Sequence, residues 1–216
     1  MKLPITPYGL VPVAATSAAC IVLAAACYLV IGAYAFLILF PAAFVVSFFR
    51  DPERHPDENS PRAVLAPADG RIVAITDGRM PSSGAPASVV DIFLSIFDVH
   101  LNRAPMAGRV VETRYRKGLF LNALRASAAD LNESNVIVME VDSGRQLAVR
   151  QIAGVIARRI VCAVSPGDYV EAGQRLGMIR FGSRTQLYIP AEMEFRPDVA
   201  MGQHVRAGKS VLGHVK

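Results

Sequence analysis

A strand-like segment, residues 176–181, runs into the pair Gly182-Ser183, and the chain then continues into a second strand-like segment, 185–190. Glycine weakens a strand interior and often marks a close approach of the backbone. A serine hydroxyl placed there can attack the carbonyl of the residue before it and convert the amide into an ester, and glycine leaves that carbonyl open. Elimination of the ester would free the upstream chain and leave a pyruvoyl group, an electron sink comparable to pyridoxal. A Gly-Ser pair alone is usually a turn, so this interpretation needs support elsewhere.

Two further motifs carry groups that can hold or move a proton. His100 lies in Phe-Asp-Val-His-Leu-Asn-Arg (97–103), at the end of an apolar strand, and imidazole titrates near neutrality. Asp69 lies in Pro-Ala-Asp-Gly (67–70), before another strand, where a carboxylate can orient a histidine. The structural alternatives are a histidine with an ordinary hydrogen bond and a simple Asp-Gly turn.

Arg158 and Arg159 stand side by side among apolar residues. A guanidinium fork suits phosphate and carboxylate oxygens, so the pair is a candidate anion site, with a solvated charge pair as the alternative. The three cysteines show no metal-ligand or disulfide spacing and are expected to be small apolar fillers, so no metal is predicted.

The elements that must position these residues fall into an apolar head and a charged body. Residues 3–49 contain no charged side chain and no histidine. A membrane span needs about 20 apolar residues, so we expect residues 1–49 to form a membrane anchor, a helical hairpin with spans near 8–30 and 33–49. The alternatives are a shallow hairpin within one leaflet and a single span, which would place the body outside.

Basic residues flank the head on both sides: Lys2 before it, Arg50 and Arg54 after it. Basic flanks favour the cytoplasmic side, so the hairpin predicts an inner-membrane protein whose body faces the cytoplasm. The net charge of +5 and the pI of about 9.4, next to an apolar head, favour an anionic lipid surface. No nucleic-acid signature is visible, and no nucleic-acid partner is expected.

A proline-rich linker, residues 50–61, precedes a body, 62–216, that reads mostly as short strands. Strands are expected at residues 64–75, 88–97, 108–116, 135–141, 145–152, 160–164 and 176–181. The segment 155–159 fits a short helix or a strand. Two stretches, 167–173 and 202–208, share the pattern Gly, two residues, Val, one residue, Ala-Gly, each followed by Leu-Gly. This echo predicts a repeated strand-turn-strand unit and resembles the flattened barrel-sandwich of biotinyl and lipoyl domains. We therefore expect a mainly β body behind an apolar helical hairpin.

In combination, these motifs resemble phosphatidylserine decarboxylases, in particular the short branch that includes archaetidylserine decarboxylases. The resemblance runs from about residue 48 to residue 216, and the apolar head matches as well. The matching pieces are Phe-Arg-Asp-Pro (49–52), Ala-Pro-Ala-Asp-Gly-Arg (66–71), Phe-Asp-Val-His-Leu-Asn-Arg (97–103), Gly-Leu-Phe-Leu-Asn (118–122), Gln-Ile-Ala-Gly (151–154), Ala-Arg-Arg-Ile (157–160) and Arg-Phe-Gly-Ser-Arg (180–184).

The resemblance implies a precursor that cuts itself between Gly182 and Ser183 into chains 1–182 and 183–216, which stay together as a heterodimer. Ser183 would become the pyruvoyl cofactor and capture the amine of phosphatidylserine as a Schiff base, so that carbon dioxide leaves and phosphatidylethanolamine is released. Asp69 and His100 would assist self-processing, and His100 would also transfer a proton during decarboxylation. Arg158 or Arg159 would hold the lipid phosphate. A further homo-oligomer is left open.

One departure from the longer bacterial branch concerns Arg103, which stands where that branch has a second histidine. His100 would then serve both self-processing and turnover, or Arg103 would take one of these two roles. Arg103 is also a candidate for contact with the substrate. Other interpretations stay open: an archaetidylserine or other amino-lipid decarboxylase, a pyruvoyl enzyme for a soluble amino acid, and a non-enzymatic membrane-anchored barrel. The last predicts one intact chain near 23 kDa.

Overall fold

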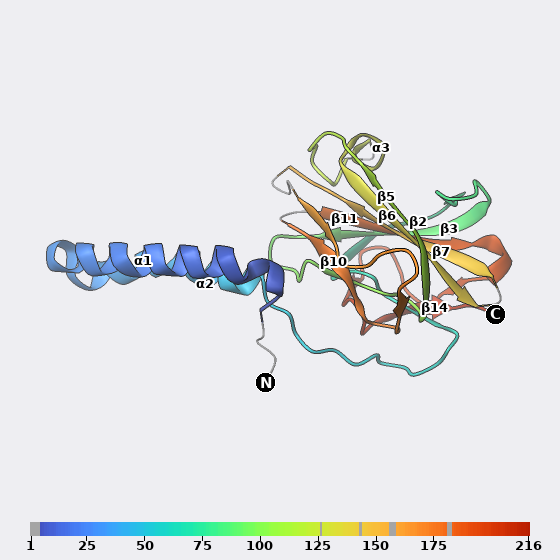
Figure 1. The fold of residues 1–216 in the computed structure, drawn as a ribbon, viewed down its shortest axis with the longest axis horizontal. Coiled ribbons are helices and arrows are strands. Elements are labelled where there is room, and N and C mark those ends of the chain that lie inside the picture. The colour runs from blue at the N-terminus through green and yellow to red at the C-terminus, as the bar shows by residue number, and fades with distance from the viewer. Residues whose placement is uncertain (1–4, 126, 143, 156–158, 181–182) are drawn as a thin grey trace. The chain divides into compact units, whose positions relative to one another are not determined.

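The computed structural model describes residues 5–125, 127–142, 144–155, 159–180 and 183–216 (Figure 1). The chain divides into two compact units, Met1–Glu53 and Arg54–Lys216. The first unit is helical: η1 (Pro7–Gly9), α1 (Leu10–Ile31), η2 (Gly32–Leu39) and α2 (Phe40–Phe48). The second unit is built from short strands and holds every residue for which chemistry is predicted.

The helical unit folds back on itself at Gly32, whose φ of 56° suits glycine and ends α1. The rings of Tyr28 and Phe36 lie 6.1 Å apart across this turn. At the other end the Thr6 amide donates to the Phe49 carbonyl at 2.9 Å, so the two ends of the unit meet. The helical stretch Pro7–Phe48 is long and apolar enough to cross a membrane, which is consistent with membrane association.

The β-rich unit is organised around a curled eight-stranded antiparallel sheet that forms a half-barrel (Figure 1). In spatial order its strands are β13 (His204–Val205), β2 (Gly70–Arg79), β3 (Pro86–Leu94), β11 (Ser183–Pro190), β7 (Arg145–Ile152), β6 (Ser134–Asp142), β5 (Gly108–Arg116) and β9 (Tyr169–Val170).

Two three-stranded sheets complete this unit. One has the order β4 (Leu101–Arg103), β10 (Arg175–Ile179), β8 (Ile160–Cys162); the other has the order β1 (Ala63–Leu65), β14 (Val211–His214), β12 (Arg196–Pro197). Short helical turns, α3 (Ala128–Leu131) and η3 (Ala191–Met193), interrupt the strands.

Strand β11 is buried along its whole length because it lies between β3 and β7 with side chains packed on both faces. Leu187 and Ile189 join the main core, whereas Tyr188 packs in a second apolar cluster on the opposite face. Alternation along the strand puts Ser183 and Thr185 on the same face as Leu187. Ser183 therefore faces the interior of the half-barrel.

The prediction of a mainly β body behind an apolar helical segment is confirmed. One expected strand, residues 64–75, is two strands, because the amides of Leu65 and Ala66 turn to the carbonyls of Pro105 and Ser210. The expected repeat is present as β9, a turn and β10, and again as β13, a turn and β14. The segment 155–159 is described only at Val155 and Arg159.

Glycines at the turns bring the two copies of this repeat together. Gly173 and Gly208 have φ values of 78° and 65°, and a Cβ on Gly208 would lie 3.1 Å from the Cα of Gly173. Their amides make equivalent bonds, at 2.8 Å, to the carbonyls of Ala104 and Ala66. Glycine is needed at both corners because the backbones touch there.

Candidate active site

The pairing register brings the predicted residues to one end of the large sheet, here called the Ser183 end. Ser183 pairs with Leu94, the last residue of β3, and Arg184 pairs with Ile152, the last residue of β7. Ile152 in turn faces Ser134, the first residue of β6. The strands therefore begin or end together, and their connecting segments leave the sheet at the same place.

Ser183 is the first residue of β11, and its side chain is fully buried. Its Oγ has no hydrogen-bond partner among the described residues. A buried hydroxyl without a partner loses its hydration with nothing in return, and such groups are few in native structures and need an explanation. Gly182, the other half of the predicted cleavage site, lies outside the described residues.

His100 is also fully buried, directly before β4. Its Nδ1 lies 2.9 Å from the Asp98 carbonyl oxygen. A carbonyl can only accept, so Nδ1 carries the proton, and Nε2 is the basic nitrogen of the neutral ring. The His100 carbonyl accepts from the Ile179 amide at 3.1 Å. The chain before the predicted cleavage site is thus held at Ile179 by the segment that carries His100.

The Asp98 carboxylate fixes the turn that presents His100. It accepts hydrogen bonds from the amide and the Oγ of Ser95, both at 2.8 Å, and pairs with Nε2 of His204 at 2.9 Å. Burial alone would raise the pKa of the Asp98 carboxyl, but the hydrogen bonds from Ser95 and His204 outweigh burial and lower it. Asp98 therefore stays ionised and holds the turn near neutral pH.

Asp69 lies at the same end, just before β2, and is engaged by Arg54. Two guanidinium nitrogens of Arg54 donate to its two carboxylate oxygens, at 2.8 Å and 2.7 Å. The amide of Ala207 donates to the same carboxylate at 2.8 Å. Asp69 thus joins the linker to the segment before β14, and its bonds are accounted for without His100.

A chain of buried amides, missed by the sequence analysis, ties the two sheets together beside these residues. Asn102 donates to the Thr185 hydroxyl at 3.0 Å and accepts from Gln151 at 2.9 Å, and Gln151 accepts from Asn135 at 2.9 Å. Thr185 is two residues after Ser183, and Asn102 is two residues after His100. Because side chains two residues apart on an extended chain point to the same side, Thr185 lies on the side of Ser183, and Asn102 lies on the side of His100.

The opposite face of β11 carries a second anchor. Arg184 forms a buried bidentate pair with Asp91 of β3, and Gln186 donates to the same carboxylate at 3.1 Å. Hydrogen bonding to Asp91 is the main cause that raises the pKa of Arg184, so the pair stays charged. Strand β11 is therefore fixed on both faces immediately after Ser183.

Asn132 ties the long β5–β6 segment to the Ser183 end. Its buried side chain bonds the amide and carbonyl of Leu121, at 2.9 Å and 2.8 Å, and the carbonyl of Ala153 at 2.8 Å. Ala153 follows β7 and so lies next to the start of β11. Gly118 has to be glycine here, because a Cβ would lie 2.5 Å from the Asn132 backbone.

The predicted arginines have different surroundings. Arg158 lies outside the described residues. Arg159 is exposed, and its carbonyl accepts from the Arg180 amide at 3.2 Å, which places it close to the start of β11. Arg103 is buried, and its guanidinium donates to the Gly173 carbonyl at 3.0 Å. This contact favours a structural role for Arg103.

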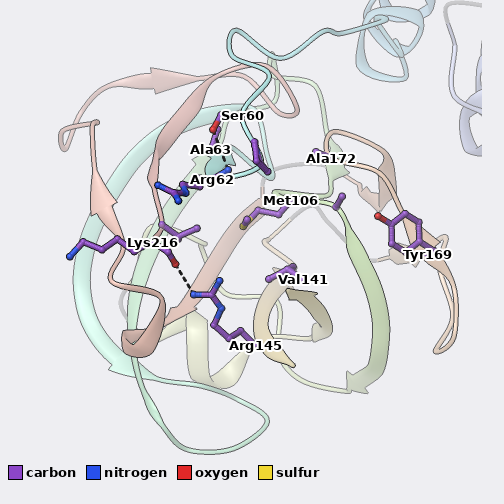
Figure 2. A pocket seen from close by; sticks show the side chains of 12 residues that line it. Ser60, Arg62, Ala63, Met106, Val141, Arg145, Tyr169, Ala172 and Lys216 are labelled. Atoms are coloured by element: carbon purple, nitrogen blue, oxygen red, sulfur yellow. Dashed lines mark hydrogen bonds between the residues drawn. The ribbon is translucent and has the colours of Figure 1, made fainter. Parts of the chain in front are cut away.

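A pocket of about 540 Å³ lies at the other end of the sheet (Figure 2). It is lined by Val141 and Arg145 of the β6–β7 hairpin and by Tyr169 of β9, among others. Arg145 donates to the Lys216 carbonyl at 2.6 Å across it. It contains neither Ser183 nor His100, so it is separate from the residues for which chemistry is predicted.

Comparison with known proteins identifies the family of this chain. The family model described as phosphatidylserine decarboxylase matches residues 41–213. The chain is 45% identical over 170 residues to the phosphatidylserine decarboxylase proenzyme of Magnetococcus marinus, covering 78% of this chain and 77% of that protein. The proenzymes of Desulfotalea psychrophila, at 45% identity (78% and 78% covered), and of Gluconacetobacter diazotrophicus, at 46% (78% and 75%), are similar. This chain belongs to the phosphatidylserine decarboxylase family and is an enzyme.

Proposed function

We propose that this chain is a proenzyme that cleaves itself between Gly182 and Ser183 and then decarboxylates phosphatidylserine to phosphatidylethanolamine. The supporting observation is the fully buried Ser183 hydroxyl with no hydrogen-bond partner among the described residues, at the sheet end that also holds His100. The similar proteins are phosphatidylserine decarboxylase proenzymes, which favours phosphatidylserine over other amino-lipids as the substrate.

Self-cleavage would begin with attack of the Ser183 Oγ on the Gly182 carbonyl carbon. His100 Nε2 would take the hydroxyl proton, and the Gly182–Ser183 amide would become an ester with a free Ser183 amine. Loss of the Ser183 α-proton would then break the Cβ–Oγ bond and release a carboxylate at Gly182. The remaining dehydroalanine would hydrolyse with loss of ammonia, leaving a pyruvoyl group at the start of chain 183–216.

The Ser183 hydroxyl has no hydrogen-bond partner among the described residues, which is compatible with a pyruvoyl group formed from this side chain. The pyruvoyl carbonyl would supply an electron sink for the bond to the departing carboxylate. His100, held by Asp98, would return a proton to the product carbon. Burial of the site would disfavour the charged carboxylate and so favour its loss.

Asp69 is proposed to support processing by holding the segment before β14 in place, with its carboxylate fixed by Arg54 and Ala207. Arg159 is proposed to attract the lipid phosphate, since it is exposed beside the Ser183 end. Arg103, which is buried and donates to the Gly173 carbonyl, is proposed to support the turn at Gly173. Arg158 remains a candidate for phosphate binding on sequence grounds.

We further propose that the hairpin anchors the enzyme in the inner membrane with the catalytic unit facing the cytoplasm, and that the two chains persist as a heterodimer. Intact-mass analysis of the purified protein tests the central step. Two polypeptides are expected, residues 1–182 and residues 183–216, and the shorter one should begin with a pyruvoyl group. Ser183→Ala should remain one chain near 23.2 kDa. An uncut wild-type chain with an ordinary serine would overturn the proposal.

His100→Ala tests the proton-transfer role separately from folding. It should remain uncut while keeping the circular dichroism spectrum of folded Ser183→Ala, although loss of the buried ring should lower its melting temperature. For the cleaved wild type, release of carbon dioxide from carboxyl-labelled phosphatidylserine reports the second reaction. Full cleavage in His100→Ala would remove His100 from the processing step.

A further inference from the structure

The Ser183 end of the sheet is surrounded by exposed apolar side chains. Five of the eight exposed large hydrophobic residues described within residues 54–216 lie in the segments that leave this end, each between 48% and 71% exposed. We call them the apolar rim: Phe97, Leu119, Leu124, Leu131 and Val155. Exposed apolar groups gathered at one place mark a surface that meets another apolar phase or partner.

The pairing register places the rim around the site. Phe97 follows the last residue of β3 by three positions, and Val155 follows the last residue of β7 by three. Leu119, Leu124 and Leu131 lie between the end of β5 and the start of β6, which face each other at this end. The Asn132 side chain bonds the Ala153 carbonyl, so this segment adjoins the one that carries Val155.

The charge on these segments is mainly positive. Among the described residues, the exposed cations are Arg116, Lys117, Arg125 and Arg159, against a single exposed acid, Asp130. Arg180 is half-buried beside them, and burial followed by the like charge of Arg159 lowers its pKa. A surface that combines exposed apolar groups with uncompensated cations is complementary to an anionic leaflet.

We propose that the apolar rim, with its basic residues, is a docking surface for an anionic lipid bilayer and acts in addition to the helical anchor. The inference rests on the proposed function, because the substrate would be a diacyl lipid whose headgroup must reach the fully buried Ser183. An anchor limits the distance between the enzyme and the bilayer, but it does not select which surface meets the lipid. The rim would select the Ser183 end.

The absence of tryptophan from the sequence provides a direct test. Leu124→Trp is placed in the full-length Ser183→Ala chain and reconstituted in phosphatidylcholine vesicles with or without phosphatidylglycerol, a fraction of the acyl chains being brominated. The indole should emit at shorter wavelength and be quenched by bromine when the anionic lipid is present. Because this chain cannot process itself, the result does not depend on enzymatic activity.

Tyr169→Trp is the matched control. Tyr169 is 59% exposed, but it pairs with Arg109 of β5, at the opposite end of the sheet from Arg116. Seven residues of strand separate the two ends, about 23 Å, so an indole at 169 should remain unquenched when the rim is docked. Equal quenching at 124 and 169, or none at 124, would overturn the proposal. So would a spectral shift at 124 that rises with protein concentration without quenching, because it would indicate self-association.

Activity provides a second, independent measurement on the processed enzyme. Leu124→Ser combined with Arg125→Ser should raise the KM for phosphatidylserine in vesicles by about fivefold or more. The kcat/KM for a monomeric short-chain phosphatidylserine should stay at the wild-type level. Tyr169→Ser should change neither. Equal losses on both substrates would overturn the docking role, whereas no turnover by the wild type would count against the proposed function and leave the fluorescence result standing.

Discussion

Arg54 holds the Asp69 carboxylate with both terminal nitrogens, and the side chains are only 10% and 7% exposed. The main chain of Ala207 closes the arrangement, because its amide donates to Asp69 and its carbonyl accepts from Arg54 at 3.3 Å. A residue directly after the helical unit is therefore bonded to a turn before β2 and to the segment before β14.

Arg54→Ala should strongly destabilise the β-rich unit. The substitution leaves a buried carboxylate without its counter-charge, which costs about 3–5 kcal/mol. Urea unfolding of the full-length Ser183→Ala chain would measure the loss. Lys209→Ala is the control: Lys209 pairs with Asp57 at 3.7 Å on the surface, so its loss should cost less than about 1 kcal/mol. If both substitutions lowered the free energy of unfolding equally, the buried Arg54–Asp69 pair would contribute no more to stability than the surface pair.

Thr185→Val should slow self-cleavage, and it should also lower the stability of the fold. The substitution preserves shape but removes the acceptor for Asn102, at a cost of about 1–3 kcal/mol, and loosens the link between the strands that carry Ser183 and His100. Thr185→Ser should restore cleavage to near the wild-type rate. The cleaved fraction against time, measured by intact mass, gives the rates.

Thr76→Val provides the matching control, since Thr76 is half-buried in β2 away from this network. It should leave the cleavage rate unchanged. If Thr185→Val cleaves normally at a reduced melting temperature, the amide chain has only a structural role.

Gly118→Ala should disturb the β5–β6 segment and with it the Ser183 end. The added Cβ would lie 2.5 Å from backbone atoms of residues 131–133, and such overpacking typically costs about 1–3 kcal/mol. The cleavage rate and the melting temperature should both fall. Ser127→Ala, on the exposed part of the same segment, should change neither.

His214 should make stability depend on pH. Hydrogen bonds to Glu58, and then to Asp198, raise the pKa of His214 above its ordinary value of 6.5. A raised folded-state pKa means that this stabilisation is fully present below about pH 6.5 and is lost as pH rises through the folded value. The difference in melting temperature between wild type and His214→Asn should therefore be largest at about pH 5 to 6, where the imidazole is protonated and both carboxylates are ionised, and shrink toward pH 9. A constant difference would contradict the ion pairs.

Local sequence patterns predicted most of the strands, because alternation and turn residues act over short distances. Strands β5 and β7 have the predicted bounds, and the repeated glycine pattern forms two similar turns. The interruption at residues 66–69 could not be predicted, since it depends on carbonyls of Pro105 and Ser210, far along the chain.

The sequence motifs named residues for the candidate site, but they did not give the hydrogen bonds that hold these residues in place. Ser183 and His100 lie at the same end of the sheet. Asp69 is bonded to Arg54, which the sequence placed in the proline-rich linker. The sequence did not predict the chain of buried amides, although Asn102 lies in the motif at residues 97–103 and Gln151 in the motif at residues 151–154. Polar residues flanked by strand-forming apolar ones were the available signal, but their mutual bonds follow only from tertiary packing.

The position of β11 determines what a cut before Ser183 would do to the molecule. The fragment beginning at Ser183 would supply the strand between β3 and β7, as well as partners for β1 and β2. The two fragments could then separate only if β11 lost its hydrogen bonds to β3 and β7 and the half-barrel opened. The processed enzyme should migrate as one particle, and its lifetime should be governed by the rate of unfolding, with no ordinary dissociation equilibrium between the fragments.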